Sequence, residues 1–457
     1  MSNLPPHPSV SFWQANPHDL HNHRSTEHLP THSDIVIIGA GYAGVSTAYH
    51  LLTDFTERVG SITILEARGA CSGATGRNGG HLRPDLYGHI PTYIERAGAE
   101  AGAEIAEFEI AHVHAIKQLI EREQIDCDFM LTRTMDVWCN AEAAEKARRV
   151  YERMKEHGFG YMDDVIFYSE NAERICGVKG AVACASYTAA TMWPYKFVMQ
   201  LLAKIVAAGK VNLQTYTPAL SVTAAPEGGW NVTTPRGTIH ADKVIHASNA
   251  YVATLLPEYK RNIIPCKGLC CRIAVPEGSD APLLTNSYIN RTEDNVLSYL
   301  IPRADGGIIV GGASAVFKPF REQWYNNVDD SVLVEEVKDY YDGYMQRTYR
   351  GWEHTDAKVD KVWTGVMGYS YDSNPHVGAV PGKQGHFILA GLNGHGMPVI
   401  WLAAKGLAKM VVEGAEFEQT GMPRLFKTTR ERIERAQAGS EEGGDILGTG
   451  SFFATKQ

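Results

Sequence analysis

The chain lacks the features of several large classes of protein. No apolar stretch reaches the roughly 18 residues that are needed to span a bilayer. No run of Lys or Arg stands out in a sequence whose net charge is −9, which disfavours nucleic acid as a partner. The first residues contain no basic segment followed by an apolar core, so we expect no secretory signal. These absences predict a protein with no membrane span and with a cytoplasmic location.

Cysteine is scarce, and its spacing indicates no special chemistry. The eight cysteines of this 457-residue chain form no C-x-x-C pair, and no histidine lies near Cys266, Cys270 and Cys271 at a ligand spacing. We therefore expect reduced thiols. Residues 1–33 form a polar leader with several histidines at irregular intervals, which we expect to lie along the surface, anchored by Phe12 and Trp13. The sequence predicts no metal site.

What the chain does contain is typical of a globular protein. Hydrophobic residues make up 44% and charged residues 21% of the sequence. The length predicts two or three domains, or one large α/β unit with an insertion. Helical periodicity is expected over residues 97–123, 141–157, 196–208 and 328–345, and strand-like alternation over 262–313.

A strand, a glycine-rich turn and a helix follow one another near the start. In residues 34–38, Asp34 is followed by four apolar residues, as in a buried parallel strand, and residues 45–55 have helical spacing. Between them lie Gly39, Gly41 and Gly44. In such a motif the first glycine makes the tight turn, the second admits a pyrophosphate, and the third lets helix and strand pack closely. The pattern predicts a dinucleotide-binding site.

The next strand and loop extend this site. Residues 61–65 form a second apolar strand that ends in Glu66, where a carboxylate can accept hydrogen bonds from ribose hydroxyls and repel a 2′-phosphate. Residues 69–81 are rich in glycine and alanine, which lets backbone N–H groups approach a ligand. No second unit of this quality exists for NAD(P)H, so we expect electrons to come from an organic substrate.

With these motifs the chain resembles the FAD-dependent oxidoreductases related to D-amino-acid oxidase, glycine oxidase and sarcosine oxidase. The resemblance covers roughly residues 34–413 and rests on four segments in family order: residues 37–44, 71–81, 244–251 and 390–397. The run Arg77-Asn78-Gly79-Gly80 is most similar to the γ-glutamylputrescine oxidase-like branch. The resemblance implies an α/β fold: a Rossmann-type FAD-binding domain with a second, α+β substrate domain built on a mixed sheet.

The resemblance also implies domain boundaries. The FAD-binding domain is expected to be discontinuous, formed by residues 34–95, 170–260 and 360–415. Residues 96–169 and 261–359 would form the substrate domain. Residues 416–457 would follow as a C-terminal helix and a mobile tail.

The cofactor implied is FAD, which we expect to be noncovalent. No cysteine follows Cys271, and Asn78 stands where some relatives carry a linking histidine, although His81 leaves a covalent link open. Ala219 would contact the adenine, and the backbone of residues 391–397 would stabilise negative charge at N1/O2 of reduced flavin. The residues implied to bind FAD are Gly39, Gly41, Tyr42, Ala43, Gly44, Glu66, Ala67, Arg68, Ser72, Gly73, Ala74, Thr75, Arg77, Asn78, Gly79, Gly80, Ala219, Ala247, Ser248, Gly391, Asn393, Gly394, His395, Gly396 and Met397.

The sequence says less about the residues that bind the substrate. Five are candidates: His81, Arg83, Lys267, Tyr299 and Arg303. Arg83, just past the flavin loop, could clamp a substrate carboxylate, but a structural ion pair is equally expected. Tyr299 and Arg303 could face the flavin or serve in sheet packing and as a surface charge. Sarcosine oxidases carry a lysine over the flavin; the matching stretch, residues 308–312, has none, and Lys267 is the nearest alternative.

The function implied is oxidation of a C–N bond in an amine or amino acid to an imine, by hydride transfer to flavin N5. O2 is the expected acceptor, although oxidase and dehydrogenase activity both remain open. One alternative is oxidation of a nitrogen-containing secondary-metabolite scaffold. Another is a flavin-binding protein without amine oxidase activity.

Overall fold

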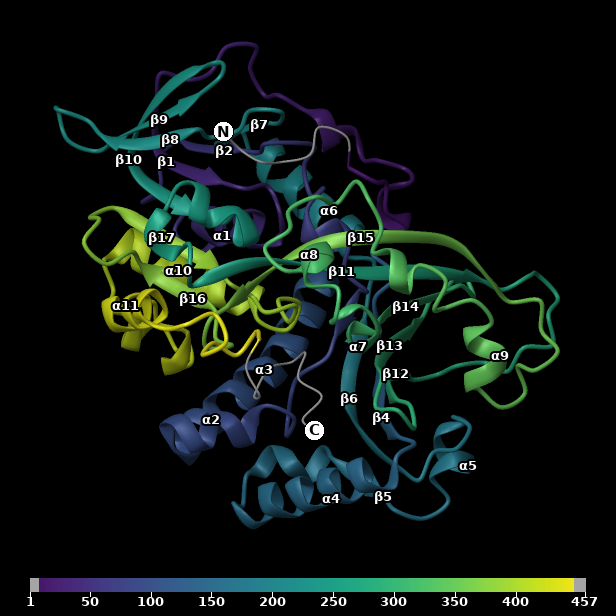
Figure 1. The fold of residues 1–457 in the computed structure, drawn as a ribbon. Coiled ribbons are helices and arrows are strands. Elements are labelled where there is room, and N and C mark those ends of the chain that lie inside the picture. Colours follow the sequence, from purple (N-terminus) through teal and green to yellow (C-terminus); the bar gives the residue numbers. More distant parts are fainter. Residues whose placement is uncertain (1–7, 448–457) are drawn as a thin grey trace.

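A computed structural model describes residues 8–447 of the chain, so the ends of the predicted leader and tail, residues 1–7 and 448–457, lie outside it. Two β-sheets, each covered by helices, make up the described part (Figure 1). The first sheet has the order β16-β17-β10-β1-β2-β7, with β9 paired to β10 and β8 to β9. Its strands are β1 (His32–Ile38), β2 (Ile62–Leu65), β7 (Val211–Gln214), β8 (Ser221–Ala224), β9 (Trp230–Thr234), β10 (Gly237–His246), β16 (His376–Ala379) and β17 (His386–Ala390).

The centre of the first sheet is parallel and buried, as its apolar strands predict. β1 lies between β2 and β10, with Ile37 opposite Ile64 on one side and Ile245 on the other. These three side chains are fully buried. Parallel strands need a crossover, and α1 supplies it between β1 and β2. The α/β fold with a Rossmann-type nucleotide-binding unit is therefore confirmed.

The second sheet is mixed, as expected. Its order is β15-β11-β14-β13-β12-β4-β6-β3, with β5 attached to β6. β12 runs parallel to β4, whereas the other neighbours are antiparallel, and β11 and β15 form two long adjacent strands (Figure 1). Its strands are β3 (His81–Leu82), β4 (Met130–Trp138), β5 (Ile166–Tyr168), β6 (Ala183–Thr191), β11 (Ile263–Ala274), β12 (Ser287–Arg291), β13 (Leu297–Pro302), β14 (Ile308–Gly312) and β15 (Lys358–Ser370).

Most of the predicted helices are present. The helices expected over residues 97–123, 141–157 and 196–208 correspond to α3, α4 and α6, within three residues at each end. In the described residues, no helix has both the length and the apolar character to cross a membrane. The α-helices are α1 (Tyr42–Asp54), α2 (Ile90–Ala97), α3 (Ala99–Glu123), α4 (Ala141–Glu156), α5 (Ala172–Cys176), α6 (Pro194–Ala207), α7 (Ser314–Phe317), α8 (Arg321–Trp324), α9 (Tyr344–Thr348), α10 (Ile400–Glu413) and α11 (Arg430–Ala438).

The helix predicted over residues 328–345 is wrong. Only a short 3₁₀ turn and the first residues of α9 are helical there. The carbonyl oxygen of Asp330 accepts a hydrogen bond from Ser9 N, and that of Val332 accepts one from Thr364 Oγ1. Backbone groups that would close helical turns are therefore engaged with other segments.

Three strands lie in a different sheet from the one that the predicted domain boundaries give them. The shortest is β3, which falls within residues 34–95 but pairs with β6. β6 belongs to a range assigned to the FAD-binding domain, yet it pairs with β4 along its whole length in the second sheet. β15 likewise pairs with β11, although its residues from 360 onward were assigned to the FAD-binding domain. An apolar strand can pair in either sheet, and only the long-range partners decide between them.

The described part of the leader does not only lie along the surface, because it also packs against the glycine-rich loop. Trp13 is fully buried, and its Nε1 donates to the carbonyl oxygen of Asn78 at 2.5 Å. Ser11 Oγ and Gln14 Nε2 both donate to the carbonyl oxygen of Gly76, at 2.5 and 2.8 Å. The described part of the leader therefore supports the glycine-rich loop from behind.

Candidate functional site

A cavity of about 610 Å³ joins the carboxyl ends of the parallel strands to the second sheet. Gly39 and Glu66 line it from the ends of β1 and β2, and Ala247 from the end of β10. Tyr299 and Met367 line it from β13 and β15. Ligands of open α/β sheets bind beyond the carboxyl ends of the strands, and this volume is typical of a ligand site.

The glycine turn brings two backbone segments into close contact. Gly39 has φ +116°, and a Cβ atom there would lie 2.7 Å from the carbonyl oxygen of Ala247. A Cβ on Gly44 would lie 1.9 Å from the carbonyl oxygen of Gly39, so α1 packs directly on the turn. The first turn of α1 faces the glycine-rich loop, where Thr75 Oγ1 accepts a hydrogen bond from Tyr42 N at 3.0 Å. This arrangement requires glycine at both positions.

Glu66 is held at the edge of the cavity by backbone donors. Its Oε2 accepts from Ala40 N and its Oε1 from Arg68 N, both at 2.9 Å. The carboxylate is thereby oriented beside Ala219, which also lines the cavity. This position suits a group that binds ribose hydroxyls.

Arg68 and Arg77 line the cavity but turn their charges toward Asp330. Arg68 Nη1 lies 2.9 Å from Asp330 Oδ1, and Arg77 Nε lies 3.4 Å from Asp330 Oδ2. All three side chains are buried, and burial lowers the pKa of Arg77. These two arginines therefore fix the loop to the segment around residue 330.

Most of the residues implied to bind FAD meet around this cavity. Twenty of the twenty-five line it, from Gly39 in the first turn to Met397 before α10. The five that do not line it are placed behind it: Gly44 packs on Gly39, Gly80 on the carbonyl oxygen of Met192, and Gly391 N donates to Asn249. Direct contact of these five residues with the cofactor stays a prediction, and Ser72 Oγ is buried without a partner in the described residues. The five are Gly44, Ser72, Gly80, Gly391 and Asn393.

At the other end of the cavity, Arg83 is committed to an ion pair. Its Nη2 donates to both carboxylate oxygens of Asp136, at 3.0 and 2.9 Å, and the guanidinium lies 5.2 Å from the ring centroid of Tyr187. Tyr87 OH donates to the same carboxylate at 2.6 Å. Burial opposes the charge of Arg83, but Asp136 together with Tyr187, Asp85 and Tyr87 outweighs burial and raises the pKa of the guanidinium. The structural ion pair is thus the interpretation that the geometry supports.

Arg291 is the cationic residue that the sequence analysis missed. It ends β12, lines the cavity, and its guanidinium lies 4.9 Å from the ring of Trp138 on the paired strand β4. Its Nη1 is buried without a hydrogen-bond partner, and it forms no ion pair within residues 8–447. In the sequence, Arg291 is distinguished only by its place at the end of a strand. The pairing of β12 with β4 in the structure was needed to show that it lines the cavity.

Three polar residues near Arg83 and Arg291 carry no net charge into the cavity. His81 Nε2 lies 2.8 Å from Ser287 Oγ, and burial, helped by Arg83, lowers the pKa of His81 well below its usual value. Tyr299 OH lies 2.8 Å from Cys270 Sγ, and burial raises the pKa of Tyr299. His395 pairs with Glu109 at 2.9 Å. Burial would lower the pKa of His395, but Glu109 outweighs burial and raises it.

Arg303 and Lys267 do not line the cavity. Arg303 is buried beneath the rings of Phe12, Trp13 and Trp193, and it pairs with Asp305 at 3.1 Å. It therefore anchors the leader and does not face a substrate. Lys267 is buried beside β15, and burial lowers its pKa. The expected substrate roles of these two residues are not supported.

The residues at the strand ends fit FAD. The glycine turn leaves space for phosphate beside the N-terminus of α1, and Glu66 is oriented for a ribose. Ser248 lines the cavity with a buried Oγ that has no partner in the described residues. A buried hydroxyl without a partner indicates a polar ligand at this point.

Comparisons with known proteins agree with this site. The chain is 23% identical over 412 residues to a probable oxidoreductase, OrdL, of Haemophilus influenzae, covering 86% of this chain and 87% of the relative. It is 24% identical to a gamma-glutamylputrescine oxidoreductase of Escherichia coli, covering 84% of each. The structure of glycine oxidase from Geobacillus kaustophilus has the same fold, with TM-score 0.69, 20% identity, and coverage of 88% of this chain and 99% of that one. The family model described as FAD dependent oxidoreductase matches residues 34–410, and the chain belongs to that family.

Proposed function

We propose that this FAD-dependent oxidoreductase oxidises a CH–NH unit of a small amine or amino acid to a C=N unit. The substrate carbon loses a hydride and the nitrogen a proton. When bound, FAD supplies the acceptor of that hydride at its N5 atom. The relatives named for glycine and for gamma-glutamylputrescine support an amine as the electron donor.

The observation that carries the proposal is the uncompensated charge of Arg291. The cation of Arg83 is paired with Asp136, and Asp85 contacts His89. Arg291 alone brings a cation to the cavity wall without an ion pair in the described residues. A guanidinium with a buried free donor fits a carboxylate, so an amine that also carries a carboxylate is the substrate we favour.

The other residues at the end of the cavity that holds Arg83 and Arg291 position the substrate and limit its contact with water. Ile289, Leu297 and Phe317 give it apolar walls. His81 is neutral, so it does not repel a substrate amine, and Tyr299 keeps its proton. Both can hydrogen-bond a substrate without changing the charge of the chamber.

O2 is the acceptor that we propose for the second half of the reaction, and it would yield H2O2. A cytoplasmic location stays our prediction, supported by eight cysteines that are all free. The alternative substrate, a ring nitrogen of a larger metabolite, would not need the cation of Arg291.

The test is anaerobic titration of the purified yellow protein with a panel of amines. The panel pairs each carboxylated amine with its decarboxylated or esterified analogue. We expect bleaching of the flavin absorption by carboxylated amines and H2O2 on admission of air. Bleaching by ring amines alone would favour the metabolite alternative. A protein that binds FAD and is bleached by no amine would contradict the proposed function, and reoxidation of the flavin only by an artificial dye, without H2O2 in air, would contradict O2 as the acceptor.

A further inference from the structure

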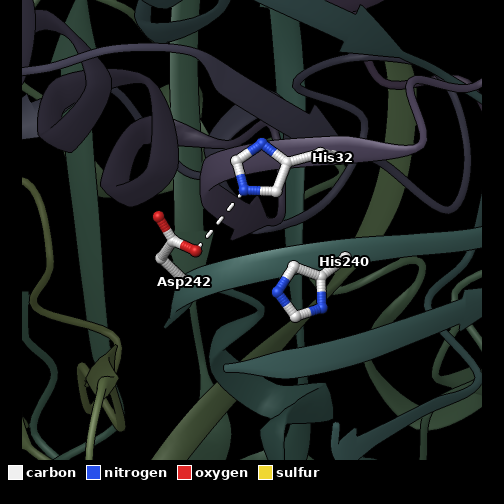
Figure 2. Close-up of side chains that lie close together, drawn as sticks. All are labelled: His32, His240 and Asp242. Carbon is white, nitrogen blue, oxygen red and sulfur yellow. Dashed lines mark hydrogen bonds and ion pairs between the residues drawn. The ribbon is translucent and has the colours of Figure 1, made fainter. Parts of the chain in front are cut away.

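Three side chains of the kind that bind transition metals meet outside the cavity, on the first sheet (Figure 2). His32 is the first residue of β1, and the parallel register places it opposite His240 on β10. Asp242 lies two residues further along β10, so it shares the face of His240. The pairing of two strands thus assembles a cluster whose members are far apart in the sequence.

The distances between the three groups suit a bound ion. Their ligand atoms all lie within 4.8 Å of one another, and His32 Nε2 lies 3.4 Å from Asp242 Oδ1. Around a tetrahedral Zn²⁺ with bonds of 2.0–2.1 Å, neighbouring donor atoms are separated by roughly 3.4 Å. The widest of the three separations exceeds this value by at most about 1.4 Å, which rotation of the side chains would have to close.

A fourth residue orients His240. Glu227 Oε1 lies 3.4 Å from His240 Nδ1, and Figure 2 shows the other ring nitrogen turned toward Asp242. The contact with Glu227 is longer than a hydrogen bond, but a carboxylate on this side of the ring favours an ion at Nε2, as in many metal sites. His32 and Asp242 are about half exposed, with side-chain exposures of 51% and 55%, so an ion and its water ligands can enter from solvent.

We propose that His32, His240 and Asp242 bind a divalent transition metal ion, with Glu227 positioning His240. Two imidazoles and one carboxylate select Zn²⁺ and its neighbours over Mg²⁺ or Ca²⁺, which prefer oxygen ligands. The ion would tie the first residue of β1 to β10 and to the turn before β9. It would thereby fix the point at which the leader joins the sheet.

The experiment is calorimetric titration of the metal-free, tag-free, FAD-loaded protein with Zn²⁺. We expect one Zn²⁺ per chain, with affinity reduced at least about tenfold in His32→Ala and in Asp242→Asn, and reduced less in Glu227→Gln. His28→Ala is the matched control, because His28 is an exposed histidine of the same leader outside the cluster. Zn²⁺ should also raise the thermal unfolding midpoint of the wild-type protein but not of the two ligand variants.

Two results would overturn the proposal. One is a wild-type protein that binds no Zn²⁺. The other is binding that His32→Ala and Asp242→Asn leave as strong as in His28→Ala, which would place the ion at another site. Unchanged flavin absorption in every variant shows that the fold is intact, so weaker binding cannot be ascribed to unfolding.

Discussion

Arg83 and Asp136 form a buried two-point ion pair at the substrate end of the cavity, with Nη2–Oδ distances of 3.0 and 2.9 Å. Asp136 is 1% exposed and also accepts the hydroxyl of Tyr87. A charge pair with so little exposure is costly to break, because little solvent can replace the lost partner. The pair therefore fixes the geometry of β4 and of the segment after the glycine-rich loop, and the function proposed above assigns the recognition of a carboxylate to Arg291.

Replacing Asp136 with Asn should destabilise the protein strongly. The change keeps the shape of the side chain but leaves the Arg83 cation unpaired, which we expect to cost about 3–5 kcal/mol of unfolding free energy. Glu413→Gln is the matched control, since it breaks the exposed pair with Arg58 and should cost less than about 1 kcal/mol. Urea unfolding of both variants measures the difference, and equal costs would contradict the structural role of the pair.

Replacing Arg291 with Met should impair carboxylated substrates selectively. Losing a charged hydrogen bond of about 3 kcal/mol predicts a fall of roughly 100-fold in kcat/KM. The kcat/KM of Arg291→Lys should fall between those of the wild-type protein and Arg291→Met, because lysine keeps the charge but loses the planar fork. The decarboxylated analogue of the same substrate is the internal control, and an equal loss on both would show that Arg291 does not bind the carboxylate. FAD affinity should stay unchanged in both variants.

The nucleotide-binding end could be predicted because its information is local. Gly39, Gly44 and Glu66 lie within two strands and one helix that follow each other in the chain, and their spacing alone sets the turn. The loop after Glu66 is equally local, so its residues line the cavity as expected. A motif of consecutive residues has the same local geometry whichever strands pair beside it.

The substrate end depends on strands brought together from distant parts of the chain. Arg291 faces the cavity because β12 pairs with β4, and Arg303 turns away because the leader covers it with Phe12 and Trp13. Arg291 ends β12 and Arg303 directly follows β13, two strands of similar pattern, so the sequence did not separate them. The cluster of His32 and His240 was missed for the same reason, since only the register of β1 with β10 makes them neighbours.

Replacing Gly39 with Ala should abolish or strongly weaken FAD binding. The new Cβ would lie 2.7 Å from the carbonyl oxygen of Ala247, at a φ of +116° that a side chain rarely adopts. Gly160→Ala is the matched control, because Gly160 does not line the cavity and its Cβ would meet nothing within 4 Å. Quenching of flavin fluorescence measures both affinities. Similar dissociation constants for the two variants would show that the close approach at Gly39 does not shape the cofactor site.

Replacing His112 with Gln should flatten the acid side of the stability profile. His112 is fully buried in α3 beside the hydroxyl of Tyr42, at 3.3 Å, and burial lowers its pKa from 6.5 to about 3. Between these two values the unfolded chain binds a proton that the folded chain does not. Stability therefore falls as the pH falls, by about 1.4 kcal/mol per pH unit for this one group.

His112→Gln should remove that part of the slope between about pH 6 and pH 4, measured by urea unfolding at several pH values. The matched control is His114→Gln on the same helix, because His114 is exposed and its replacement should leave the slope unchanged. Burial also lowers the pKa of His246, His376 and His386, so part of the acid sensitivity must persist in the variant. A slope identical to that of the wild-type protein would mean that His112 is protonated in the folded state, which is incompatible with its buried contact with Tyr42.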